Sequence, residues 1–280
     1  MRPSGSRAVR ATPTSPPTIE TASIGSPQDS PLALQHAARQ LRDVESVLLE
    51  RYRAALQGSV LELVPGGSRL TEELVHQARA YIGIGPSPAV INVCRQVYLA
   101  GRFLVSDIGD LEQFEPGGFD VVFAGRCAID NLGTERRRGL FEAVHRVLGQ
   151  GGLWIFSSHN AASPELQQFA APSSGRRQRG LLRGLRLRSS RAPMDERELG
   201  DELLTGIDGD PSAGPYRITR EAQEQQLAEL GFELGECIDL GGHQVSSDAP
   251  ASESPELHYV ARPALPGGST PPAGGGGVAM

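Results

Sequence analysis

Apolar residues recur along the central part of the chain in short runs that alternate with longer amphipathic stretches. Runs rich in Val, Leu, Ile and Phe predict buried strands, and stretches with apolar residues every three or four positions predict helices. Strands are expected at 59–64, 80–84, 103–106, 120–124, 153–157, 232–239 and 257–261. Helices are expected at 32–56, 70–79, 88–100, 136–148 and 217–230. Such alternation indicates an α/β domain with a mostly parallel sheet that helices cover on both faces.

Three segments depart from this alternation. Residues 1–29 are rich in Pro, Ser and Thr, and residues 263–280 are rich in Pro and Gly, so both are predicted to be disordered tails around a domain at 30–262. Within that domain, 161–214 forms an insertion whose segment 175–191 repeats Leu and Arg. This segment is interpreted as an amphipathic helix, either a solvated basic face or a lid or partner-docking element.

Composition narrows the class of protein. The net charge of −6 argues against a dominant nucleic-acid-binding surface. No apolar run is long enough to span a bilayer, and no secretory signal is recognisable, so no membrane partner is expected. The widely spaced Cys94, Cys127 and Cys237 offer neither a metal knuckle nor a disulfide framework, which suits a reducing cytoplasm. The histidines lack ligand spacing, so no metal is predicted.

The chemistry is expected at the residues that directly follow the strands. In an open parallel sheet, ligands bind beyond the carboxyl ends of the strands, near the point where the strand order reverses. The segments at that edge would be 64–69, 85–88, 107–108, 125–132 and 157–160. They contain a Pro-Gly-Gly turn and several polar side chains.

Five motifs in this order resemble class I S-adenosylmethionine (SAM)-dependent methyltransferases over residues 38–262. They are VLELVPGGSRLT, YIGIGPSPAVINVCRQ, SDIGDLEQFEPGGFDVVFAGRCAIDNL, RRRGLFEAVHRVLGQGGLWIFSSHN and YRITREAQEQQLAELGFEL. The resemblance implies a Rossmann-like fold with a seven-stranded, mostly parallel sheet, helices on both faces and an antiparallel C-terminal strand. It also implies SAM as cofactor and S-adenosylhomocysteine as product.

The resemblance assigns cofactor roles to particular positions. Glu62 stands where an acid orients the methionine moiety or the loop, and Gly66 is the central glycine of the turn, where the backbone passes close to the cofactor. Asp107, followed by Ile108, stands where an acid takes the adenine amino group. Ala124 begins the floor of the methyl-transfer site.

Two departures from the family pattern affect this site. Val64 and Ser68 replace the first and third glycines of the turn, and a β-branched Val resists a positive φ. Gly85 replaces the acid that holds both ribose hydroxyls. That loss should weaken binding by roughly 2–4 kcal/mol, on the order of 30- to 1000-fold, unless Ser87 or Glu62 compensates.

The acceptor side is expected beside the strands at 120–124 and 153–157. His159 is either a general base or a local hydrogen-bond partner, and Asp130 either orients an acceptor or caps a helix. Arg126, Asn160 and Tyr216 are predicted to contact substrate. Cys127 is interpreted as a small core residue.

Two classes of function follow from these patterns. The first is a methyltransferase for O, N or C atoms of a small molecule held beneath the insertion at 161–214. The second is a catalytically inactive methyltransferase-like scaffold that binds a partner protein, or a second copy of itself, through the Arg-rich insertion. The altered residues Val64, Pro65 and Gly85 favour the scaffold, whereas Glu62, Gly66 and Asp107 favour the enzyme. Non-methyl chemistry on the same fold is a third alternative that nothing in the sequence selects.

Overall fold

A computed structural model describes residues 40–66, 68–170, 215–246 and 252–264. The helices are α2 (Asp43–Arg51), α3 (Arg53–Leu56), α4 (Arg69–Gln77), α5 (Pro88–Val97), η2 (Ala128–Asn131, a 3₁₀ helix), α6 (Thr134–Val147), α7 (Pro164–Ala170) and α9 (Arg220–Glu229). The strands are β1 (Ser59–Leu63), β2 (Ala80–Gly85), β3 (Arg102–Val105), β4 (Phe119–Ala124), β5 (Leu148–Asn160), β6 (Arg217–Ile218), β7 (Phe232–Asp239) and β8 (Glu256–Pro263).

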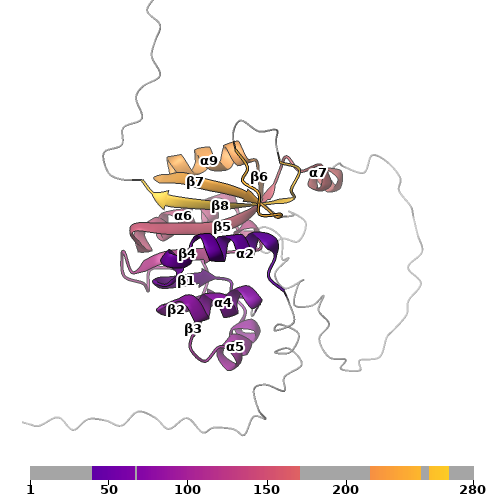
Figure 1. Ribbon diagram of the computed structural model, residues 1–280. Coiled ribbons are helices and arrows are strands. Elements are labelled where there is room, and N and C mark those ends of the chain that lie inside the picture. The colour runs from indigo at the N-terminus through magenta and orange to yellow at the C-terminus, as the bar shows by residue number, and fades with distance from the viewer. Residues whose placement is uncertain (1–39, 67, 171–214, 247–251, 265–280) are drawn as a thin grey trace, which may run out of the picture.

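The strands form one twisted sheet in the order β3-β2-β1-β4-β5-β8-β7, with the short β6 added beside the end of β5 (Figure 1). Pairs among β3, β2, β1, β4 and β5 are parallel, and β8 runs antiparallel to both β5 and β7. The strand order reverses between β1 and β4, which creates the crevice position where open α/β sheets bind ligands. This topology confirms the predicted Rossmann-like class I methyltransferase fold.

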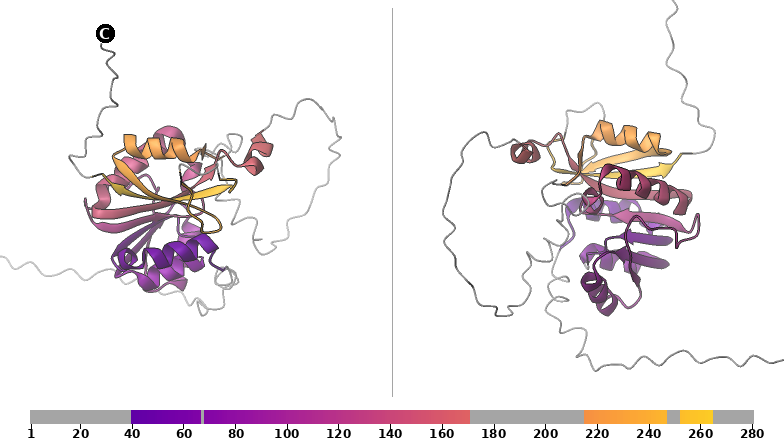
Figure 2. Two further views of the ribbon diagram at one scale, coloured as in Figure 1. Left: turned by 45° about the horizontal axis from the view of Figure 1, so that its top comes forward. Right: turned by 180° about the vertical axis from the view of Figure 1, so that it is seen from behind.

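Helices cover both faces of the sheet (Figures 1 and 2), and each face carries its own apolar core. Leu48 of α2, Leu74 of α4 and Ile91 of α5 are fully buried in one core. On the opposite face, Phe141 of α6 packs edge-on against Trp154 of β5, and Leu227 of α9 joins the same cluster. Burial on both faces explains why the central strands are nearly continuous apolar runs.

Some element boundaries differ from the sequence prediction. In the described part of the expected 32–56 helix, Tyr52 interrupts the helical turns and separates α2 from α3. The expected 217–230 helix starts only at Arg220, because the Thr219 hydroxyl caps α9 and residues 217–218 pair with β5. Helices η2 and α7 were not expected. The predicted tail at 1–29, most of the predicted tail at 263–280 and most of the insertion at 161–214 lie outside the described residues. Pro263, predicted as the start of the C-terminal tail, is the last residue of β8.

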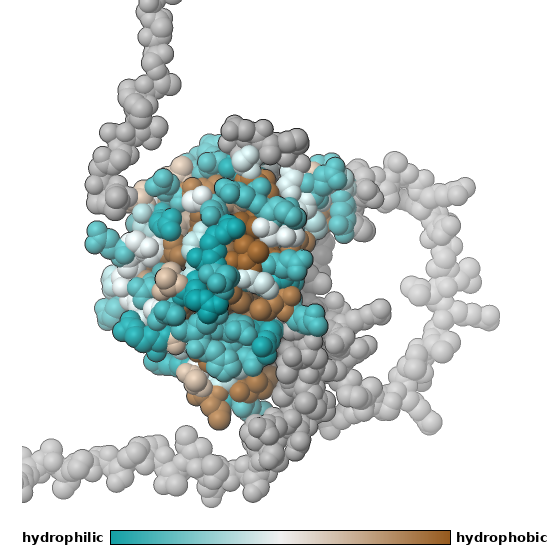
Figure 3. Space-filling view, viewed as in Figure 1, coloured by the Kyte–Doolittle hydropathy of each residue, from teal (hydrophilic) through white to brown (hydrophobic). Residues whose placement is uncertain are grey.

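The visible face over α2 and α4 is largely hydrophilic, with smaller hydrophobic areas between the polar side chains (Figure 3). This distribution fits helices that turn one stripe toward the sheet and the other toward water. Among the described residues, none of the helices combines the length and the apolar character needed to cross a bilayer.

Candidate functional site

A cavity of about 310 Å³ lies at the carboxyl ends of β1, β4 and β5. It is lined by Arg42, Glu62, Val64, Gly66, Ser68, Leu70, Gly125, Arg126, Cys127, Ala128, Asn131, His159 and Glu256. The loop after β1 therefore forms one wall, and the loop after β4 together with the end of β5 forms another. The cavity sits at the reversal of strand order, where the sequence placed the site.

The loop after β1 keeps the shape of a glycine turn although two of its glycines are replaced. Val64 has a φ of 56°, which lies in the left-handed region that a β-branched residue rarely adopts. Its N–H donates to the carbonyl of Ile84 at 2.7 Å, so the strained conformation is tied to the end of β2. A Cβ added to Gly66 would meet no atom within 4 Å, which leaves open space over this backbone. Ser68 is buried and precedes α4.

Glu62 is a buried carboxyl group on the wall of the cavity. It accepts hydrogen bonds from the hydroxyls of Thr71, at 3.1 Å, and Tyr81. Burial raises the pKa of Glu62 to about 7 despite these two hydrogen bonds. The carboxyl group is therefore partly protonated near neutral pH.

Five predicted cofactor residues lie outside the cavity wall, namely Gly85, Ser87, Asp107, Ile108 and Ala124. Gly85 is buried, and a Cβ there would lie 3.6 Å from Pro65, an ordinary contact distance. Ser87 caps α5, because its Oγ accepts the Val90 N–H at 3.4 Å. Asp107 pairs with Arg136 at 2.5 Å and is half exposed. The Ile108 side chain is buried in the core.

The loop after β4 contains two consecutive residues in the left-handed region. Arg126 and Cys127 have φ values of 56° and 53°, and strained non-glycine residues of this kind cluster at functional sites. Ala124, which precedes them, is fully buried. The Cys127 N–H donates to the Ser157 hydroxyl at 2.8 Å, and Arg126 pairs with Glu45 at 3.1 Å.

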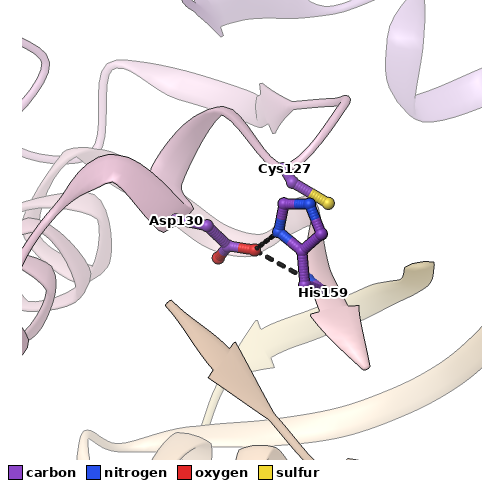
Figure 4. A group of neighbouring side chains, drawn as sticks. All are labelled: Cys127, Asp130 and His159. Carbon is purple, nitrogen blue, oxygen red and sulfur yellow. Dashed lines mark hydrogen bonds and ion pairs between the residues drawn. The ribbon is translucent and has the colours of Figure 1, made fainter. Parts of the chain in front are cut away.

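Asp130 and His159, which the sequence assigned separately to the acceptor side, lie next to each other. The Nδ1 atom of His159 lies 2.7 Å from Asp130 Oδ2, and the imidazole lies between Asp130 and Cys127 (Figure 4). Asp130 Oδ1 accepts from Arg137 Nη1 and from the Ser158 hydroxyl, each at 2.7 Å. Asp130 and Arg137 are fully buried, whereas His159 reaches the cavity. The arrangement fixes the imidazole and leaves its Nε2 atom without a partner from Asp130.

Tyr216 and Asn160 lie beside the site but outside the cavity wall. The Tyr216 ring stacks at 4.5 Å from the Arg137 guanidinium, and its N–H donates to the Asp130 carbonyl at 2.8 Å. The Asn160 amide donates to the carbonyls of Ser252 and Ser254 at 2.7 and 2.9 Å. Both side chains hold the loops around the site in place.

Sequence reasoning missed three charged residues of the site. Arg42 pairs bidentately with Glu256 at 2.7 and 3.1 Å, and both line the cavity. Nothing local in the sequence signals a pair that joins residues so far apart along the chain. Arg137 did have a signal, because it shares the apolar stripe of its helix with Phe141 and Val144.

Comparisons with known proteins agree with this geometry. Residues 60–152 match the family model described as Methyltransferase domain. The fold is similar to that of an S-adenosylmethionine-dependent methyltransferase from Clostridium acetobutylicum, with 13% identity, a TM-score of 0.55, and 81% of this chain and 94% of that chain covered. It is also similar to the CcbJ methyltransferase from Streptomyces caelestis, with 17% identity, a TM-score of 0.50, and coverage of 80% and 90%. No curated protein matches the chain.

The two similar structures support the fold, and the family match covers the chain from β1 to the beginning of β5, including the loop after β1. Residues 60–152 therefore match a methyltransferase domain, and the described residues adopt the class I methyltransferase fold.

Proposed function

We propose that this chain transfers a methyl group from SAM to a small-molecule acceptor in the cavity at the ends of β1, β4 and β5. One observation carries the proposal: the cavity has the turn of Val64, Gly66 and Ser68 on one wall and His159, backed by Asp130, on another. A donor-binding turn and a fixed imidazole thus face the same space.

The lining residues fit the methionine half of SAM. Glu62 offers a carboxylate, and the open backbone at Gly66 allows a ligand to approach closely. The ribose half has weaker support, since Gly85 supplies no acid and Asp107 is paired with Arg136. SAM affinity should accordingly be lower than an intact ribose-binding acid would give.

The side chains at the acceptor end can accept a proton. SAM, when bound, supplies an electrophilic methyl group and leaves as S-adenosylhomocysteine. The Asp130 carboxylate accepts a hydrogen bond from the Nδ1–H of His159, so the Nε2 lone pair of the neutral imidazole is available to an acceptor hydroxyl or amine. Positioning of acceptor and donor supplies most of the remaining rate.

Size and charge support a small acceptor. A cavity of about 310 Å³ lies at the lower end of the range for small-molecule sites. The net charge of −6 disfavours a nucleic acid substrate. The described cysteines are free and buried, which is compatible with work in a reducing cytoplasm.

A catalytically inactive scaffold is the second candidate function. The missing acid at Gly85 and the Asp107–Arg136 ion pair favour it, because both remove contacts to the nucleoside. The Arg-rich part of the insertion that would contact a partner, at 175–191, lies outside the described residues.

Calorimetry with SAM and S-adenosylhomocysteine separates the two candidates. The enzyme should bind both ligands, and His159→Gln should leave their affinities unchanged because His159 serves the acceptor. Methyl-labelled SAM, incubated with a library of small phenols, amines and carboxylic acids, should then label one class and lose that labelling in His159→Gln. No heat and no thermal shift at millimolar SAM would overturn the enzyme and leave the scaffold.

A further inference from the structure

The wall of the cavity also carries a thiol and an imidazole whose donor atoms lie close together. One donor atom from each of Cys127, Asp130 and His159 lies within 4.8 Å of the other two. Figure 4 shows Cys127 and Asp130 on different sides of the His159 ring. The methyl-transfer proposal uses only the imidazole and the carboxylate, so the Cys127 thiol is left without a role.

We propose that Cys127 Sγ and His159 Nε2 form a binding site for a thiophilic divalent cation of the Zn²⁺ class. Thiolate and imidazole are the ligands that Zn²⁺ prefers, and tetrahedral coordination would place sulfur and nitrogen about 3.6 Å apart. The donor atoms of Cys127, Asp130 and His159 already lie within 4.8 Å of one another, so a small adjustment of the side chains would bring sulfur and nitrogen to this spacing. The remaining coordination positions would open into the cavity, where water or an acceptor atom can enter.

Asp130 acts in this site by orienting the ligand. Its Oδ1 is occupied by Arg137 and Ser158, and its Oδ2 by the backbone and ring nitrogens of His159. A carboxylate that holds Nδ1 of a histidine and turns Nε2 toward a metal is a recurrent second layer of metal sites. Because both oxygens of Asp130 already accept hydrogen bonds, Asp130 is not itself a metal ligand. Its hydrogen bond to Nδ1 makes Nε2 of His159 a better one.

Carboxylates lie close to the Cys127 thiol. Glu256 lines the same cavity, and Asp130 belongs to the same cluster of donor atoms. Their negative charges attract a cation, which would replace the thiol proton. In that step the S–H bond breaks, its electron pair forms the sulfur–metal bond, and one proton passes to the buffer.

Cation binding and acceptor deprotonation exclude one another, because both need the Nε2 lone pair of His159. A bound cation would therefore inhibit transfer to acceptors that must lose a proton. This inference does not depend on SAM binding, since both ligands come from the loop after β4 and from β5.

Titration of the full chain with Co²⁺ and with Cd²⁺, in a phosphine reductant, tests the site. We expect a sulfur-to-metal charge-transfer band and the release of one proton per cation. Cys127→Ser should abolish the band, and His159→Gln should weaken Co²⁺ binding by at least about 100-fold. The controls Cys94→Ser and Cys237→Ser remove buried thiols that lie outside the cavity wall and should keep the band.

The folded state of each variant is checked by its near-UV circular dichroism. The absence of a band in the folded wild-type protein, or its persistence in Cys127→Ser, would overturn the site. SAM calorimetry on the same samples separates this result from the outcome for methyl transfer.

Discussion

Oδ2 of Asp130 accepts both the backbone N–H and the ring Nδ1 of His159, each at 2.7 Å. One carboxylate oxygen therefore fixes the position of the residue and the orientation of its ring. Because an ionised carboxylate can only accept, Nδ1 carries the ring proton and Nε2 keeps its lone pair. Arg137 donates to the other oxygen at 2.7 Å and balances the buried charge.

The Asp130–Arg137 pair should contribute far more to stability than the exposed Asp107–Arg136 pair. Asp130→Asn leaves a fully buried guanidinium without its counter-charge, and we expect a loss of about 3–5 kcal/mol in the free energy of unfolding. Asp107→Asn breaks a pair that is about half exposed, so the loss should be about 0–1 kcal/mol. Urea unfolding of both variants measures the difference. Equal losses would show that Arg137 finds another partner in the core.

The sheet and the region of the site could both be predicted from the sequence. Apolar runs such as the one at 120–124 are long enough to mark buried strands, and the residues after them had to meet at one edge. The long-range pairs could not be predicted in the same way. Arg42 and Glu256 become partners only because α2 and β8 meet at the cavity, and no local pattern records that contact.

The Val64 prediction concerned backbone strain, and the structure shows how that strain is maintained. The sequence identified a β-branched residue where the turn needs a positive φ, and the residue does adopt 56°. A hydrogen bond from its N–H to the Ile84 carbonyl holds it there. No pattern in the sequence indicated that Asp107 would pair with Arg136, because that pair joins a loop to a separate helix.

The Val64→Gly variant should be more stable than the Val64→Ala variant. Both Val64→Gly and Val64→Ala remove the same packing atoms beyond Cβ, but only glycine adopts a φ of 56° without steric cost. We expect Val64→Gly to unfold with a free energy about 1 kcal/mol higher than that of Val64→Ala. Val105 is an exposed β3 position without a positive φ, so there the alanine variant should be more stable than the glycine variant. The same order at both positions would mean that the turn relaxes when the side chain is removed.

Stability should depend on pH through Glu62. Its pKa is raised from the ordinary 4.5 to about 7, so the folded state binds an extra proton between these values. The stabilisation is complete below about pH 4.5 and is lost as the pH rises through about 7. The shift corresponds to about 3 kcal/mol. His258, whose pKa is lowered to about 4, acts in the opposite direction, so the total pH profile of the protein hides this contribution.

Comparison with Glu62→Gln isolates the contribution of this carboxyl group. The free energy of unfolding of the wild type, relative to the variant, should fall by about 3 kcal/mol between about pH 4 and about pH 8. Charges of Glu45 and Arg126 also act on Glu62, in opposite directions. Glu142→Gln, at an exposed position on α6, serves as the control and should show little change. A constant difference between wild type and Glu62→Gln would mean that water reaches the carboxyl group.

Restoring an acid at the end of β2 should strengthen SAM binding. A Cβ at position 85 lies 3.6 Å from Pro65 and from the Val64 backbone, so the aspartate of Gly85→Asp can enter without displacing the turn. A carboxylate there would accept hydrogen bonds from both ribose hydroxyls, and we expect about 30-fold tighter binding or more. Gly139→Asp adds the same charge on the exposed face of α6 and should leave the affinity unchanged. If calorimetry finds equal gains for both variants, the effect comes from net charge. If Gly85→Asp gains nothing while remaining folded, the ribose contacts have been lost together with the acid, and only the methionine half of the site persists.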